Sequence, residues 1–210
     1  MRRSGATGPQ PVVIFLHGWG LTGSGVYRLW IRHLAALGNT VIVPRYQRDA
    51  KADPGLVRAW ALAGIRQALR RVDVAPKTLV VAGHSAGAAL AADYAAIARA
   101  ASLPRPVGVF AVYPGRRILG YPAGIPEADP ARIPGDTRLT VMAGTRDVVV
   151  GLEPARDLHR RAVRIPATRR RLVVVREQGA ADHYAPTRSG PRARRVFWRR
   201  LDRLIDAARR

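Results

Sequence analysis

The 210-residue sequence contains no cysteine, only two lysines, and few aromatic residues, which make up 6% of the chain. Without cysteine the chain can form no disulfide, no thiolate nucleophile and no cysteine-ligated metal site. The aromatic residues do not form the interleaved basic and aromatic platform on which single-strand nucleic-acid binders stack bases. Nucleic acid is therefore not expected as a partner.

Long hydrophobic runs are also missing. No apolar run approaches the roughly 20 residues that a membrane-spanning helix requires. The first run, Val12–Leu16, is too short for the apolar core of a signal peptide, and no small-residue cleavage site follows it. The sequence therefore predicts a chain without a transmembrane segment, located in the cytoplasm.

Acidic residues are few. Basic residues outnumber them by 36 to 14, which gives a formal net charge of +22 at pH 7, and all but two of the basic residues are arginine. A field of this sign attracts nucleic acid, anionic membrane surfaces and acidic substrates. The arginines are scattered through every segment, which is typical of a solvated surface. We expect at most a weak association with anionic surfaces.

Apolar runs alternate with helical patterns along the whole chain. Such runs predict strands that are buried on both faces of a sheet, and they lie at residues 11–16, 40–43, 79–82, 107–113, 139–143 and 171–176. The alternation favours a parallel sheet with right-handed crossovers. We expect one α/β domain over residues 1–210, a three-layer, doubly wound, mostly parallel sheet of about six strands with helices on both faces.

Helices are predicted between these strands, and apolar positions at helical spacing indicate the face that three of them bury. A helix capped by Ser24 would bury Val26, Leu29, Trp30, Leu34 and Leu37. The helix at residues 55–72 would bury Leu56, Ala59, Trp60, Ala63, Ile65, Leu69 and Val72, and the last helix, at 191–208, would bury Val196, Phe197, Leu201, Leu204 and Ile205. Two others are expected at 86–101 and 153–163. The last helix is basic and amphipathic, so it could instead contact a membrane surface or a partner.

The stretch Gly83-His84-Ser85-Ala86-Gly87 lies between an apolar strand and an alanine-rich helix. In such a strand–turn–helix elbow the serine backbone is strained, and the neighbours two positions away must be small where strand and helix converge. The hydroxyl then lies at a helix N-terminus, where unpaired N–H groups favour developing negative charge. Ser85 is therefore a candidate nucleophile.

An acid and a histidine follow later strands of the predicted sheet. Asp147 follows the fifth strand, and His183 follows the sixth. Because the carboxyl ends of parallel strands meet at one edge, we expect these side chains to lie near Ser85. A serine needs an imidazole to take its proton, and a carboxylate fixes the tautomer of that imidazole. Asp182 is the rival for the carboxylate role, but a sequence neighbour of His183 rarely reaches its ring.

With these motifs the chain resembles the α/β-hydrolase superfamily over nearly its whole length. His17-Gly18-Trp19-Gly20 is similar to the family's oxyanion loop, and Gly83 to Gly87 to its nucleophile elbow. The resemblance implies Ser85 as nucleophile, His183 as base and then acid, and Asp147 as the orienting carboxylate. It also implies an oxyanion hole made by the backbone N–H groups of Trp19 and Ala86. By the same resemblance His17 is structural and His84 points away from the site.

The resemblance is strongest to the family's minimal lidless esterases and lipases. The chain begins at what the family counts as its third strand, and residues 114–136 are too short for a full cap domain. The site should be open, or partly covered by a mobile loop. The expected acyl-pocket lining comprises Trp19, Tyr113, Ile118, Leu119, Tyr121 and Val148. Arg45, where many dienelactone-hydrolase-type relatives have aspartate, could favour a carboxylate-bearing substrate.

The predicted function is hydrolysis of small-molecule carboxylic esters through an acyl-enzyme, without metal or cofactor. The same triad could cleave thioesters, lactones or peptides. From a different class, the chain could be a non-catalytic binding protein on a hydrolase scaffold. The oligomeric state and the acyl and alcohol groups of the substrate stay open.

Overall fold

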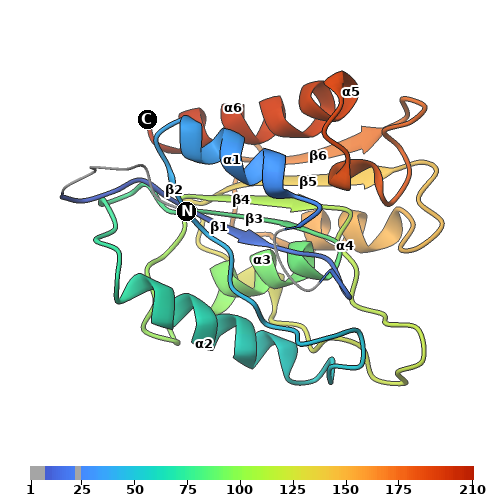
Figure 1. Ribbon diagram of the computed structural model, residues 1–210, viewed down its shortest axis with the longest axis horizontal. Coiled ribbons are helices and arrows are strands. Elements are labelled where there is room, and N and C mark those ends of the chain that lie inside the picture. The colour runs from blue at the N-terminus through green and yellow to red at the C-terminus, as the bar shows by residue number, and fades with distance from the viewer. Residues whose placement is uncertain (1–7, 22–24) are drawn as a thin grey trace.

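A computed structural model describes residues 8–21 and 25–210 (Figure 1). Six parallel strands form one sheet in the order β2-β1-β3-β4-β5-β6. They are β1 (Val12–Leu16), β2 (Thr40–Ile42), β3 (Val80–His84), β4 (Gly108–Val112), β5 (Arg138–Gly144) and β6 (Arg170–Val175). The predicted fold class is confirmed, and each strand lies where an apolar run predicts it.

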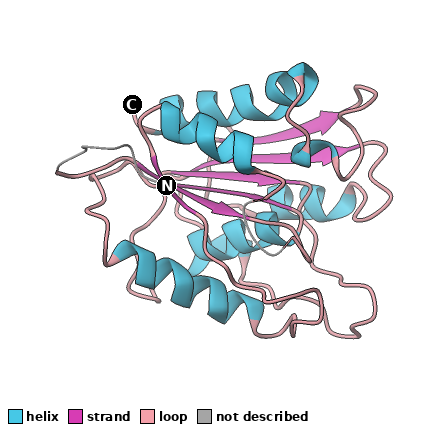
Figure 2. Ribbon diagram, in the orientation of Figure 1, coloured by secondary structure: helices cyan, strands magenta, loops and turns pink. Residues whose placement is uncertain are grey.

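Helices cover both faces of the sheet (Figures 1 and 2). One face carries α1 (Arg28–Ala36) and the C-terminal helices α5 (Pro191–Ala193) and α6 (Arg199–Ala208). The other face carries α2 (Val57–Leu69), α3 (Ala86–Ile97) and α4 (Glu153–Arg161). No helix in the described part of the chain is long and apolar enough to cross a membrane.

The central strands are apolar throughout because both of their faces are buried. In β1, Val12, Ile14 and Leu16 pack into the core beneath α2 and α3, whereas Val13 and Phe15 pack beneath α1 and α6. All five side chains are at most 1% exposed. Successive side chains of a strand point to opposite faces, so a continuous apolar run fills two cores at once.

The predicted buried face is confirmed for the last helix and partly correct for the one at 55–72, where Ile65 is buried and Leu69 and Val72 pack against the core. All five predicted core residues of the last helix are buried, and a π-helical turn, Arg194–Trp198, joins α5 to α6. In α2 the buried positions are Val57, Ala61 and Ile65, while Leu56 and Trp60 are 47% and 41% exposed. The buried face of α2 packs against α3 and lies close to Pro44, since a β-carbon on Gly64 would lie 3.1 Å from Pro44 Cβ.

The first predicted helix is partly correct. Trp30 and Leu34 are buried, but Val26, Leu29 and Leu37 are exposed, and the proposed cap Ser24 lies outside the described residues. Tyr27, Ile31 and Ala35 complete the buried face instead, at spacings of four residues.

The strand order changes direction between β1 and β3. The chain leaves β1 toward α1 on one face and leaves β3 toward α3 on the other, so the two loops diverge at the carboxyl edge. Leu16 pairs with Gly83 in the register, and both strands therefore end at the same level. Such a switch point is where ligands bind in open α/β sheets.

Candidate active site

Ser85 lies in a strained turn at this switch point. Its backbone has φ 57° and ψ −124°, a left-handed conformation that is costly for a residue with a side chain. A β-carbon on Gly83 would lie 2.2 Å from the Gly87 carbonyl oxygen, and one on Gly87 would lie 2.1 Å from that of Leu16. Glycine is therefore required on both sides, because strand and helix backbones touch there.

Ser85, His183 and Asp147 form one line of hydrogen bonds. His183 Nε2 lies 3.0 Å from Ser85 Oγ, and His183 Nδ1 lies 2.8 Å from Asp147 Oδ2. The three residues are 9%, 6% and 6% exposed. Because a carboxylate only accepts, Nδ1 carries the proton and Nε2 of the neutral ring can accept from the hydroxyl.

The Asp147 carboxylate is held in its ionised form. Burial alone would raise its pKa, but the hydrogen bonds that it accepts outweigh this and hold the pKa below its ordinary value. Its donors are the His183 ring and the backbone N–H groups of Val150 and Val149, which lie 3.0 and 2.9 Å from Oδ1. The rival Asp182 instead pairs with Arg188, at 2.7 and 2.9 Å.

The two amides expected to bind an oxyanion belong to segments that flank Ser85. Ala86 is the first residue of α3, so its N–H has no carbonyl within the helix. Trp19 follows β1, and a β-carbon on the preceding Gly18 would lie 3.4 Å from Ser85 Cβ. Within residues 8–21 and 25–210, no acceptor pairs with either amide. Their role stays a prediction.

His84 connects the loops on either side of the elbow. Its Nε2 donates to the His183 carbonyl at 2.8 Å, which leaves Nδ1 to accept from the Tyr27 hydroxyl at 2.7 Å. The same hydroxyl accepts the Gly18 N–H at 3.2 Å. Burial, and then the neighbouring His183, lower the pKa of His84 to about 3, so the ring is neutral. Both ring nitrogens of His84 are thus engaged away from the reacting hydroxyl, and one of them contacts the loop that carries His183, called here the histidine loop.

His17 has a structural role, as expected. Its Nδ1 lies 2.9 Å from the Gly18 carbonyl, and its ring stacks on Tyr46 at 4.0 Å between centroids. The Tyr46 hydroxyl donates to the His17 carbonyl. Tyr27 and Tyr46 were missed in the sequence, where neither belongs to a motif. Their partners lie 57 and 29 residues away, so no local signal marks them.

A cavity of about 730 Å³ lies next to the elbow, although none of Ser85, Asp147 and His183 lines it. It is bounded by the segment that follows β4 and by the segment that follows Asp147. The Gly115 amide, in its wall, donates to the Ser85 carbonyl at 3.2 Å. Three of the predicted pocket residues border it, namely Ile118, Leu119 and Tyr121, and of these Leu119 is fully exposed. Trp19 lies against it through an edge contact with Tyr121, at 5.9 Å between ring centroids.

Tyr113 and Val148 do not line this cavity, and their part in the acyl pocket stays a prediction. Tyr113 is wholly buried, and its hydroxyl donates to the Ala180 carbonyl at 2.6 Å. Val148 is 96% exposed and points to solvent. The backbone sets both orientations. Tyr113 has φ 53° directly after β4, and Val148 lies in a turn directly after the buried Asp147.

The segment at 114–136 is tied to α3 by a buried ion pair. Arg116 contacts Asp93 at 2.7 Å, and the same carboxylate accepts the Ala128 N–H at 3.0 Å. Asp93 is 1% exposed. These contacts hold the segment over α3, and its predicted mobility stays a prediction. Arg45 lines a different cleft, beside α2, and does not face the cavity next to the elbow.

Comparison with known proteins identifies the fold. A sequence model described as the alpha/beta hydrolase fold matches residues 13–167. No curated protein matches the chain. Carboxyl esterase 2 from the fungus Tuber melanosporum is 17% identical, with a TM-score of 0.72 over 95% of this chain and 79% of that one.

Two further solved structures are similar. A thermophilic esterase from Thermogutta terrifontis is 16% identical, with a TM-score of 0.70 over 99% of this chain and 87% of that one. Brefeldin A esterase, a bacterial homologue of human hormone-sensitive lipase, is 19% identical, with a TM-score of 0.72 over 99% and 72%. At these identities the likeness concerns the fold.

Proposed function

The chain belongs to the α/β-hydrolase fold family, and from that membership we propose that it is a serine hydrolase of carboxylic esters. The observation that carries the proposal is the line of two hydrogen bonds, 3.0 and 2.8 Å long, from Ser85 through His183 to Asp147. The structural neighbours that are named as esterases support hydrolysis of esters in general.

In the proposed reaction Ser85 Oγ attacks the ester carbonyl while His183 Nε2 takes the hydroxyl proton. The N–H groups of Trp19 and Ala86 stabilise the oxyanion of the tetrahedral intermediate. His183 then gives the proton to the leaving alcohol as the carbon–oxygen bond breaks, which leaves an acyl-enzyme. Water repeats the sequence and releases the acid. Asp147 stays ionised and stabilises the imidazolium that forms twice in the cycle.

The acyl group would occupy the cavity next to the elbow, against Ile118, Leu119 and Tyr121. A volume of about 730 Å³ accommodates a short acyl chain or part of a larger ester. Neither a metal nor a cofactor takes part in this scheme. Thioesters, lactones and peptides remain the competing substrates, because the chemistry of acylation is shared.

A fluorophosphonate probe tests the nucleophile directly. We expect labelling of Ser85 in folded wild-type protein, none in Ser85→Ala, and loss of p-nitrophenyl butyrate hydrolysis in the same variant. Ser102→Ala is the matched control, because Ser102 is exposed and also has a positive φ, 54°, but has no histidine partner. Labelling that persists in Ser85→Ala would assign the nucleophile to another residue, and an unlabelled folded protein would leave a binding role on a hydrolase scaffold.

A panel of ester, thioester, lactone and peptide substrates distinguishes the bond that is cleaved. We expect the highest kcat/KM for short-chain esters. Rapid turnover of thioesters together with no turnover of p-nitrophenyl esters would overturn the ester assignment while keeping Ser85 as nucleophile.

A further inference from the structure

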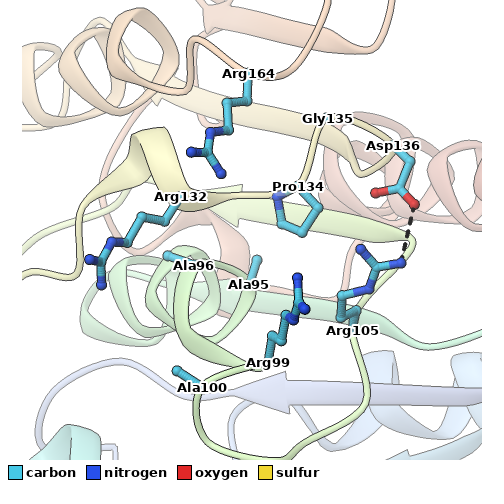
Figure 3. A pocket seen from close by; sticks show the side chains of 10 residues that line it. All are labelled: Ala95, Ala96, Arg99, Ala100, Arg105, Arg132, Pro134, Gly135, Asp136 and Arg164. Carbon is cyan, nitrogen blue, oxygen red and sulfur yellow. Dashed lines mark ion pairs between the residues drawn. The ribbon is translucent and has the colours of Figure 1, made fainter.

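A second cavity, of about 690 Å³, lies on the α3 and α4 side of the sheet, away from the triad. It opens between the C-terminal end of α3 and the segment at 132–136, and it shares no lining residue with the cavity next to the elbow. Small side chains form part of its wall, among them Ala95, Ala96 and Pro134 (Figure 3).

Four arginines from separate segments line this cavity. They are Arg99 after α3, Arg105 before β4, Arg132 at the end of a 3-10 turn, and Arg164 after α4. Figure 3 shows the guanidinium groups of Arg99 and Arg164 approaching the cleft from opposite sides. We call these four residues and the wall between them the arginine cleft.

Acidic partners are scarce in the arginine cleft. Asp136 pairs with Arg105 at 3.7 Å, and among the described residues no carboxylate pairs with Arg99, Arg132 or Arg164. Arg161, only three residues before Arg164, contrasts with them because it contacts Glu127, Asp129 and Asp157. Four guanidinium groups against one carboxylate leave a local charge of +3.

Helix ends account for part of this charge. Arg99 follows the last turn of α3 and Arg164 follows α4, where the partial negative charge of a helix terminus favours a cation. Arg132 ends only a three-residue 3-10 turn, and the like charges of the cluster repel one another. A concave, low-dielectric wall strengthens the attraction of such a cluster for an anion. The planar guanidinium fork matches the oxygens of a phosphate group in pairs.

We propose that the arginine cleft binds a small anion with several phosphate charges, of the size of a triphosphate or a nucleotide polyphosphate. This site lies at the end of α3 opposite the one that carries Ser85, and it does not depend on the proposed esterase activity. A recessed cavity suits a compact ligand better than it suits a flat membrane surface.

Calorimetric titration of the full chain with inorganic triphosphate tests the proposal. The test variant is Arg99→Gln/Arg132→Gln/Arg164→Gln, and the control is Arg28→Gln/Arg32→Gln/Arg199→Gln, three exposed arginines on the α1 and α6 side. Both variants lose three positive charges. We expect at least about tenfold weaker binding in the test variant and less than about twofold change in the control.

Equal weakening in both variants, or binding of neither triphosphate nor ATP to the wild type, would overturn the proposal. All six arginines are exposed, so both variants should fold, which thermal unfolding checks. A titration with ATP separates a nucleotide from an inorganic anion as the source of the phosphates, and binding of either supports the site. Co-sedimentation with vesicles of phosphatidylcholine and a phosphoinositide is a further measurement. If only the test variant loses co-sedimentation and the wild type binds no triphosphate, the result contradicts a small ligand. Ser85→Ala should bind triphosphate as the wild type does.

Discussion

The hydrogen bond between His183 Nδ1 and Asp147 decides which nitrogen of the ring faces Ser85. With Nδ1 protonated, Nε2 is the free base of the neutral imidazole. Asp182 adjoins His183 in sequence, yet its carboxylate is engaged by Arg188. The two aspartates therefore provide a matched pair for testing the role of the carboxylate.

Asp147→Asn should lower kcat for ester hydrolysis by about 10³- to 10⁴-fold. The amide is nearly the same size, but it carries no charge to stabilise the imidazolium and can favour the wrong tautomer. Asp182→Asn should retain at least about half of the wild-type kcat, because asparagine keeps an acceptor for the Tyr184 N–H, and the ion pair that is lost is partly exposed. Steady-state kinetics with a short-chain p-nitrophenyl ester measures both. Comparable losses in the two variants would refute the assignment.

The Tyr27 hydroxyl joins the oxyanion loop to the histidine loop through His84. Tyr27→Phe leaves the Gly18 N–H and His84 Nδ1 without this partner. We expect a loss of about 1–3 kcal/mol of unfolding free energy and a fall in kcat of about tenfold, with KM little changed.

Tyr94→Phe is the control for Tyr27→Phe. Tyr94 is also buried, and its hydroxyl donates to the Pro104 carbonyl at 2.8 Å, far along α3 from the elbow. It should lose a similar amount of stability but keep the wild-type kcat. If the two variants lose kcat in parallel, Tyr27 acts on the fold and does not position the site.

The buried neutral ring of His84 makes stability depend on pH. Burial lowers its pKa to about 3 in the folded chain, against about 6.5 when unfolded. Its contribution is complete above pH 6.5 and is lost as the pH falls toward 3, by up to about 1.4 kcal/mol per unit. Asp147 acts in a lower window, because its pKa is held below the ordinary value for aspartate.

Urea unfolding of wild type and His84→Gln between pH 7 and 4 isolates this effect. Glutamine does not titrate, so the difference in stability between the two proteins should shrink as the pH falls. Parallel curves for the two proteins would show that His84 takes up its proton as readily in the folded chain as in the unfolded one.

At the level of elements, the elbow depends on close contact between β1, β3 and α3. Gly87→Ala should destabilise the fold by about 3 kcal/mol or more, because its β-carbon would lie 2.1 Å from the Leu16 carbonyl oxygen. Gly25→Ala is the control, since a β-carbon there would meet no atom of the described residues within 4 Å. Chemical denaturation compares the two. A Gly87→Ala protein as stable as the control would contradict the close packing of the elbow.

The strands could be predicted from the sequence because burial on both faces makes each of them an unbroken apolar run. Helix faces were less predictable. In α2, alanine at several positions allows more than one apolar stripe, and the choice of Val57, Ala61 and Ile65 depends on contact with α3. The π-helical turn at Arg194–Trp198 has no sequence signal, and it leaves the buried face of the last helix unchanged.

At the scale of the whole molecule, the parallel sheet explains why the triad could be predicted. All six strands run the same way, so residues that follow β3, β5 and β6 meet at one edge whatever the strand order. The Tyr27–His84 connection and the arginine cleft could not be predicted in this way. Each brings together side chains from separate segments, and local spacing says nothing of such contacts.

The net charge of +22 should make the rate of the proposed hydrolysis depend on the charge of the substrate. A cationic field raises the encounter rate with anions, and salt screens it, since the Debye length falls from about 30 Å at 0.01 M to about 10 Å at 0.1 M. We therefore expect kcat/KM for a carboxylate-bearing ester to fall at least about threefold over this range.

The neutral methyl ester of the same compound is the control. Its kcat/KM should change little, because the field exerts no net force on it. Steady-state kinetics of both esters in sodium chloride measures the difference. A common salt dependence for the two esters would mean that the arginine-rich surface acts on the enzyme and not on the approach of its substrate.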